Sequence, residues 1–359
     1  MPLSDPRRYG PADAAPPLLK LADGAHQHEL SGALRELASG GRDLDIGRAL
    51  AATSSSVEYA RIWSALCAAI EKSPDSESVV ARVFAIPWII VCGADIPATV
   101  DCVLPNAGEL VRVLEQYGVF GGSRNLGLSG VLCGIDALEA LAPSEVLRGW
   151  ENARIRDMPP APIKVLQGVQ EVHVRYSLGA AIAPAHAPDI VETGANIGAW
   201  GTPALRAMAA QLATPNVQLL PMPRQPAGLY TAAYAGRRAG LEAAFNLFMS
   251  NSVRRFRSAW GDPSVTLSTH ASGEVRVTLW VPFDDAMTEG FRWPLHPADD
   301  LAEIERTIRS LIRDCRLAEA HVHRCILPDY TSSGAILFPR EGVTDAAQLS
   351  QSGTDQGGA

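Results

Sequence analysis

Two alternating runs near the C-terminal end constrain the fold of this chain more than any other stretch. Residues 265–269 and 275–281 alternate apolar with polar side chains and are rich in β-branched residues, which is typical of strands with one buried face. The residues between them include Gly273, which tolerates the positive φ of a tight turn. We therefore predict a β-hairpin over residues 265–281.

A helix is predicted shortly after this hairpin. Between residues 299 and 315 the apolar side chains recur every three or four positions, so they lie on one stripe of a helix. Asp300 and Glu303 suit the start of such a helix, where carboxylates accept hydrogen bonds from free N–H groups. Residues 318–327 and 335–338 have the character of short strands. The pattern predicts a mixed sheet with helices packed on one face.

The chain has 359 residues, which favours two domains. We expect a flexible arm over residues 1–25, a mainly helical domain over 26–157, an α/β domain over 163–343 and a disordered tail over 344–359. The proline-rich residues 158–162 form the predicted boundary. The fold class is thus α/β in the broad, α+β sense. Residues 79–92 are almost entirely apolar, and periodicity leaves open whether they form a helix or a strand.

The composition of the chain argues against several classes of binding partner. The net charge of −8 argues against bulk electrostatic attraction to nucleic acid or anionic lipid. The six cysteines are scattered without a CxxC pair, which favours a reducing compartment. The N-terminal residues lack the apolar core of a secretory signal, and the longest apolar run is too short to cross a bilayer. We predict a cytoplasmic protein with no membrane insertion.

The most specific polar pattern is the alternation of His321, His323 and Cys325. Residues two apart on a strand share a face, and imidazole and thiolate are suitable zinc ligands. A fourth ligand is not supplied by any nearby CxxC pair. A half-buried sheet face is the simpler interpretation.

A glycine-rich segment over residues 118–134 offers a second candidate site. Its backbone N–H groups could hold a phosphate, with Arg124 and Asn125 as the residues that contact the anion. The segment fits neither the P-loop nor the GxGxxG pattern. A tight connection between helices is the simpler interpretation.

Two surfaces are candidates for contact with macromolecules. Arg254, Arg255 and Arg257 with Trp260 could contact phosphates and stack on bases, although a solvated helix end has the same composition. A predicted polar loop over residues 284–297 carries Met287, Phe291 and Trp293, and we regard these three as the best candidate protein-contact surface.

The second half of the chain resembles a bacterial family known only as a domain of unknown function. The resemblance rests on residues 215–221, on Tyr230 and Tyr234, and on residues 279–283, 304–315 and 327–339. It implies a shared architecture and carries no activity. Relatives in this family have a close cysteine pair where this chain has residues 331–333, so the resemblance implies that any metal ligands held there are missing here.

No catalytic motif such as GxSxG or HExxH occurs, so we assign no catalytic residue and expect no cofactor. The leading hypothesis is a non-enzymatic, cytoplasmic protein that binds another protein or assembles as a homo-oligomer. One alternative is an enzyme or small-ligand-binding protein that uses Arg124, Asn125 and the strand of His321 and His323. The other is a nucleic-acid-binding protein that uses the arginines near Trp260.

Overall fold

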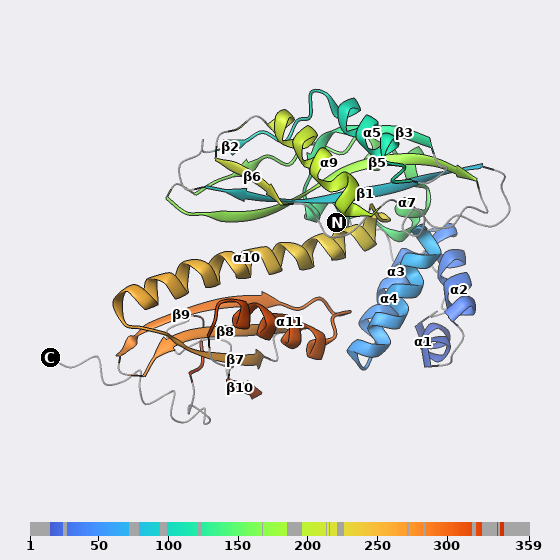
Figure 1. Cartoon of the computed structure of the whole chain (residues 1–359). Coiled ribbons are helices and arrows are strands. Elements are labelled where there is room, and N and C mark those ends of the chain that lie inside the picture. The colour runs from blue at the N-terminus through green and yellow to red at the C-terminus, as the bar shows by residue number, and fades with distance from the viewer. Residues whose placement is uncertain are drawn as a thin grey trace. The chain divides into compact units, whose positions relative to one another are not determined.

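A computed structural model shows a mixed α/β protein (Figure 1). It describes residues 15–23, 27–71, 79–93, 99–120, 124–166, 168–184, 196–212, 214, 216–220, 226–270, 273–282, 284–317, 321–324, 336 and 338–340. For residues 15–16, 79–81, 124–126, 183–184, 284–286 and 321–324 only the backbone is described. The predicted tail over residues 344–359 lies outside these ranges.

The chain divides into two compact units, Met1–Gly240 and Leu241–Ala359. This division differs from the boundary expected at residues 158–162. Strand β1 (Val79–Cys92) pairs antiparallel with β5 (Glu171–Pro184) along its whole length, so segments on both sides of the expected boundary share one sheet. The observed boundary falls within helix α10 (Leu229–Ala259), which takes part in both units.

The described part of the first unit begins with four helices: α1 (Ala15–Asp23), α2 (Gln27–Ser39), α3 (Asp43–Ala51) and α4 (Ser56–Glu71). The expectation of a flexible arm over residues 1–25 is wrong for α1. Leu18 and Ala22, four residues apart on one face of that helix, are each only 2% exposed and belong to the hydrophobic core.

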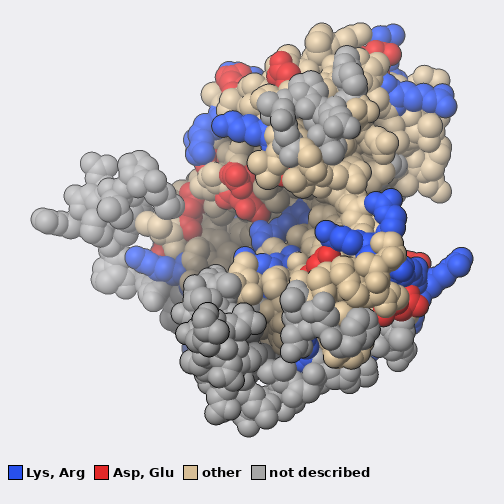
Figure 2. Space-filling model, turned by 90° about the vertical axis from the view of Figure 1, so that its left-hand side faces the viewer, with Lys and Arg blue, Asp and Glu red and all other residues tan. Residues whose placement is uncertain are grey.

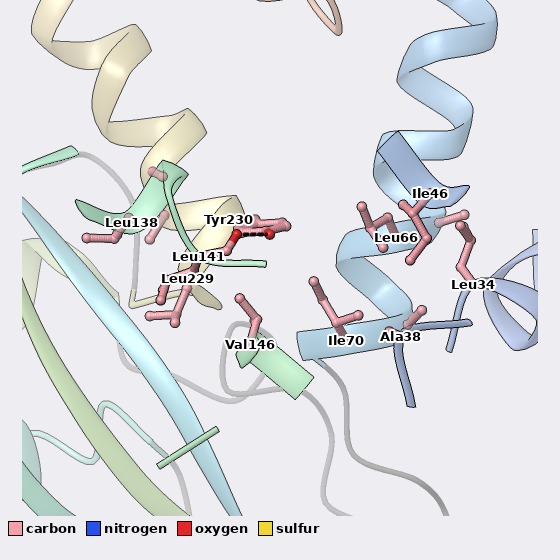
Figure 3. Packing of buried hydrophobic residues seen from close by; sticks show 14 of the residues in the cluster. Leu34, Ala38, Ile46, Leu66, Ile70, Leu138, Leu141, Val146, Leu229 and Tyr230 are labelled. Atoms are coloured by element: carbon pink, nitrogen blue, oxygen red, sulfur yellow. Dashed lines mark hydrogen bonds between the residues drawn. The ribbon is translucent and has the colours of Figure 1, made fainter. Parts of the chain in front are cut away.

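This core brings together residues from distant parts of the chain (Figure 3). Leu34, Ile46 and Leu66 of the first helices pack in one cluster with Leu138 and Tyr230. The Tyr230 hydroxyl donates a hydrogen bond of 2.6 Å to the Leu141 carbonyl, and its ring stacks on Trp63 with centroids 5.3 Å apart. The buried hydroxyl is therefore satisfied within the cluster. Short helices α6 (Ile135–Glu139), α7 (Pro143–Leu147), η2 (Gly149–Glu151) and α8 (Ala153–Arg156) complete this region.

The sheet of the first unit has the strand order β3-β5-β1-β6. It includes β3 (Arg124–Cys133) and β6 (Val217–Leu220), and the apolar residues left undecided by periodicity form strand β1. The glycine-rich segment is thus largely a strand and not a connection between helices. Residues 26–157 accordingly combine the expected helices with two long strands, β1 and β3.

Helices α5 (Ala107–Gln116) and α9 (Ile197–Leu212) cover one face of this sheet (Figure 1). Leu110, Leu114, Trp200 and Met208 from these helices pack with alternate residues of β1, such as Ile90. Pro203 lies inside helix α9. A two-stranded sheet of β2 (Thr99–Val100) and β4 (Ile163–Lys164) lies beside this core, which includes Val100 and Ile163.

Helix α10 runs without interruption past Gly236. The carboxylate of Glu71 accepts hydrogen bonds from the Tyr230 N–H at 2.6 Å and from the Thr231 N–H at 3.0 Å. These bonds satisfy donors that a helix N-terminus leaves free. A Cβ on Gly236 would lie 2.4 Å from the Tyr176 hydroxyl, so the helix packs this closely on the sheet only with glycine there.

Within its described residues, the second unit contains a mixed four-stranded sheet in the order β10-β7-β8-β9. The strands are β7 (Ser264–His270), β8 (Glu274–Val281), β9 (Asp284–Pro294) and β10 (His321–Arg324). The predicted hairpin is confirmed, since β7 and β8 pair from Ser264↔Trp280 to His270↔Glu274. Strand β10 runs parallel to β7, whereas the other neighbours are antiparallel.

Two helices cover one face of this sheet, as predicted. Helix α11 (Leu301–Asp314) begins at Asp300, whose side chain accepts a hydrogen bond of 3.0 Å from the Ala302 N–H. Its buried residues Ile304, Ile308 and Ile312 pack with Phe245 and Phe256 of α10 against the apolar side chains of the sheet. The expected loop over residues 284–297 is mostly strand β9. Within the expected final strand, Ile336 forms a single β-bridge.

Among the residues that the structure describes, no helix combines the length and the apolar character that crossing a bilayer requires.

Candidate functional site

The outer edge of strand β9 is the first feature of the candidate site. The Leu295 N–H donates a hydrogen bond to the Gly273 carbonyl, so these two opposite residues form a hydrogen-bonded pair. Such pairs recur at every second residue along β8 and β9. The backbone groups of the residues between these bonded positions point the other way, so the N–H and C=O groups of Thr288, Gly290 and Arg292 point away from β8. Within the described part of the chain, the outward groups of Thr288 and Gly290 have no backbone partner. We call them the β9 edge.

The face of this sheet opposite α10 and α11 carries polar side chains. Alternation along the strands brings residues of β7 and β8 to one face, and most of them are buried. We call this the polar face; its buried members are Thr266, Ser268, His270, Glu274, Arg276 and Thr278. Thr288 and Arg292 of β9 extend the same face to the edge of the sheet.

A carboxylate bridges two guanidinium groups on the polar face. Glu274 accepts hydrogen bonds from Arg276 Nε through Oε1 and from Arg292 Nη2 at 2.6 Å through Oε2. Burial alone would raise the pKa of Glu274, but the hydrogen bonds from Arg292 and Arg276 outweigh it and hold the pKa below its usual value. The Arg276 side chain is 1% exposed and the Arg292 side chain 44%. Arg292 therefore brings positive charge of this face to solvent beside the β9 edge.

Hydroxyl groups complete the polar face. Ser268 Oγ lies 2.9 Å from His270 Nε2, and Trp280 Nε1 donates to Thr266 Oγ1 at 3.1 Å. Ser268 and His270 are 1% and 3% exposed, so a substrate could not reach this pair as a nucleophile and its base. We interpret these groups as a hydrogen-bonded layer that supports the sheet.

Residues 338–340 contact the polar face of the sheet at β9. Phe338 packs on Gly290, where a Cβ would lie 2.1 Å from the aromatic Cδ1 atom. Arg340 Nη2 donates a hydrogen bond to Thr288 Oγ1. Side chains from residues 338–340 therefore lie over both residues of the β9 edge on the polar face.

The predicted contact surface of Met287, Phe291 and Trp293 does not lie in an exposed loop. Trp293 is completely buried, and Met287 and Phe291 are half-buried against the core under α10. The Phe291 ring contacts Phe245 and Phe248 at centroid distances of 5.2 and 5.5 Å. The alternation of β9 directs these three side chains toward the helices, so they stabilise the unit instead of forming an outer surface.

The candidate nucleic-acid residues lie at the end of α10 and have partners within the protein. Arg255 pairs with Glu289 at 2.6 Å, and Arg257 pairs with Asp262 at 2.5 Å. Arg257 also donates to the carbonyls of Cys315 and Arg316 just past the C-terminus of α11. This is a favourable position for a cation.

The other two members of that set have similar local roles. Arg254 donates to Asn251 Oδ1 at 3.0 Å, and the Trp260 ring packs on Phe256 with centroids 5.8 Å apart. Basic and acidic side chains are interspersed on the face shown in Figure 2.

The metal and ligand candidates fall in different units. Strand β10 pairs His321 with Thr266 and His323 with Ser268 in the second unit, and Cys325 lies outside the described residues. Arg124 and Asn125 belong to the first unit, where β3 pairs them with Ile182 and Ala181. In the described part of the chain, no group of three potential ligands is placed to hold a metal ion.

Sequence reasoning missed Glu274, Arg276 and Arg292. They alternate with apolar residues, and this pattern fits the solvent-facing side of a strand as well as a buried polar face. One signal was present: Glu274 and Arg276 have opposite charges two positions apart, so on a strand they share a face and can pair. Burial of that face becomes visible only in the structure.

Comparison of the chain with protein-family models, with curated proteins and with solved structures gave no match.

Proposed function

We propose that this protein binds another protein by accepting an extended segment of it at the β9 edge. The observation that carries the proposal is the outward direction of the backbone groups of Thr288 and Gly290, for which the described residues supply no backbone partner. Exposed sheet edges of this kind take up a further strand, and the main-chain hydrogen bonds then supply affinity.

The second unit is suited to such a role. Trp293, Phe245 and the isoleucines of α11 form a packed core behind the strand, so β9 is held in an extended conformation before a partner arrives. A preformed edge lowers the ordering cost of binding, because only the incoming segment has to be fixed. Each added backbone hydrogen bond contributes about 0.5 to 1.5 kcal/mol net.

The cysteines support a cytoplasmic location for this binding. Cys67, Cys92, Cys102, Cys133 and Cys315 are all free thiols, which is typical of proteins in a reducing compartment.

Substitution of Thr288 by proline tests the proposal. Proline removes the outward N–H of residue 288 and leaves the β8–β9 ladder intact, so Thr288→Pro should fold but lose binding of extended segments. Thr288→Val is the matched control, since it loses the hydroxyl bonded to Arg340 and keeps the N–H. Binding is measured with the full chain as bait for a displayed library of random ten-residue peptides.

The expected result is enrichment of peptides by the wild-type chain and by Thr288→Val, and none by Thr288→Pro. Glu289→Pro should fail to fold, because that N–H points to β8. Circular dichroism and thermal melting establish which variants are folded. Equal enrichment by a folded Thr288→Pro, or no enrichment by the wild type, would contradict the proposal.

A further inference from the structure

A segment of the chain itself lies beside the β9 edge, and its contacts show how it is aligned. Phe338 packs on Gly290, and Arg340 donates a hydrogen bond to Thr288 Oγ1. Two residues that are two positions apart in this segment thus contact two residues that are two positions apart in β9, in the opposite order along the chain. This is the register of antiparallel neighbours.

The position of Ile336 agrees with this alignment. The same register, carried two residues further, places Ile336 opposite Arg292, whose N–H and C=O groups also point away from β8. Ile336 is the residue of this region that forms a β-bridge. We call Ile336 and residues 338–340 the covering segment.

The covering segment is packed against the protein. Phe338 and Arg340 are half-buried, and Pro339 between them is buried. Neighbouring strands of a sheet lie about 4.8 Å apart, so one edge takes one neighbour at a time. A strand added from another protein therefore has to displace the covering segment from β9.

The contact of the covering segment with the β9 edge is incomplete. It meets Thr288 and Gly290 through the side chains of Arg340 and Phe338, whereas the outward backbone groups of both edge residues have no backbone partner in the described part of the chain. A segment that pairs with these backbone groups gains main-chain hydrogen bonds that the covering segment lacks at these two positions. The covering segment is therefore a weaker neighbour for β9 than a fully paired strand would be.

A buried hydroxyl group adds to this weakness. Thr278 lies opposite Gly290 on β8, is fully buried, and its Oγ1 atom has no hydrogen-bond partner. A buried polar group without a partner destabilises the state in which it is buried. The covered arrangement thus carries an unfavourable contribution next to the place where Phe338 packs.

Resting on the proposed function, we infer that the covering segment is an intramolecular competitor: it occupies the β9 edge in the free protein and is displaced when an extended segment of another protein binds.

The expected size of the effect follows from the covered fraction. A ligand that binds one conformation has an apparent affinity reduced by the fraction of molecules in that conformation. If the uncovered form is a minor state of about 10% or less, loss of the cover tightens binding by about tenfold or more.

The first test uses the tightest peptide that the wild-type chain enriches from the random library and that Thr288→Pro does not bind. This peptide is titrated against the full-length wild type, Phe338→Ala and Arg340→Ala. Phe338→Ala should bind it about tenfold more tightly, and Arg340→Ala should also bind it more tightly. Arg156→Ala, which breaks an exposed pair with Asp157, should bind it as the wild type does.

The second test supplies the covering segment as a separate molecule. A synthetic peptide of residues 334–342 is titrated against the wild type and against the double variant Phe338→Ala/Arg340→Ala. The double variant should bind this peptide about tenfold more tightly than the wild type, and the library peptide should compete with it. Circular dichroism and thermal melting establish which variants fold. Arg340→Ala keeps the aromatic contact with Gly290, so it tests the inference even if Phe338→Ala unfolds.

The outcomes separate the two proposals. Equal or weaker binding of the library peptide by the folded variants would overturn this inference and leave strand addition standing. Absence of any peptide whose binding depends on Thr288, in the wild type and in the variants alike, would overturn strand addition itself.

Discussion

At the scale of single residues, Glu274 is expected to contribute to stability through its buried ion pair. Its carboxylate holds Arg276, which is almost fully buried, so Glu274→Gln removes the charge of one partner from a buried ion pair. Removing one partner of a buried pair costs about 3 to 5 kcal/mol. We expect the free energy of unfolding to fall by this amount in urea titrations at neutral pH. Asp157→Asn, which breaks an exposed pair with Arg156, should leave it nearly unchanged.

The same carboxylate predicts a pH dependence. The folded-state pKa of Glu274 lies below its usual value of 4.5, because Arg292 and Arg276 favour the ionised form despite burial. The stability that it contributes is therefore fully present above pH 4.5 and is lost as the pH falls through the folded-state pKa. Urea titrations between neutral and acidic pH should show a smaller decline for Glu274→Gln than for wild type. An identical decline in both proteins would contradict the assigned pairing.

At the scale of elements, helix α10 depends on close approach to the first sheet. A Cβ on Gly236 would come within 2.4 Å of the Tyr176 hydroxyl and 2.8 Å of Pro87 Cβ. Gly236→Ala should therefore destabilise the protein by about 1 to 3 kcal/mol through overpacking, as measured by thermal and urea unfolding. Gly32→Ala is the control, since a Cβ there meets no atom within 4 Å and α2 should gain about 0.5 to 1 kcal/mol. Equal effects of the two substitutions would contradict the packing.

The sequence predicted those elements whose pattern is unambiguous, such as the β7–β8 hairpin and helix α11. It did not predict β9, because Asp284, Asp285 and Gly290 are poor strand formers and the partner strand supplies what local propensity lacks. The sequence places Trp293 on a surface for the same reason, because the direction of its side chain depends on the strand that carries it. The place of β9 in its sheet could not be found from sequence, since it depends on which strands pair in the folded protein.

At the scale of the whole molecule, long-range strand pairing decides where the units divide. Residues 158–162 look like a linker because of their prolines, but β1 and β5 pair across them from Val79↔Pro184 to Cys92↔Glu171. A fragment of residues 1–157 would retain β1 and β3 and lack β5, which lies between them in the sheet. It would leave two strands unpaired and expose apolar residues such as Phe84 and Ile90. We expect this fragment to aggregate or to unfold without a cooperative transition.

A fragment of residues 241–359 should behave differently. It keeps the described strands of the second sheet, helix α11 and the part of α10 that carries Phe245 and Phe256, so its core is complete. Because the apolar contacts of β7, β8 and β9 lie within this fragment, it should unfold cooperatively, as monitored by circular dichroism and calorimetry. A cooperative transition for residues 1–157 instead would place the boundary at the proline-rich segment, since burial of β1 would then not require β5.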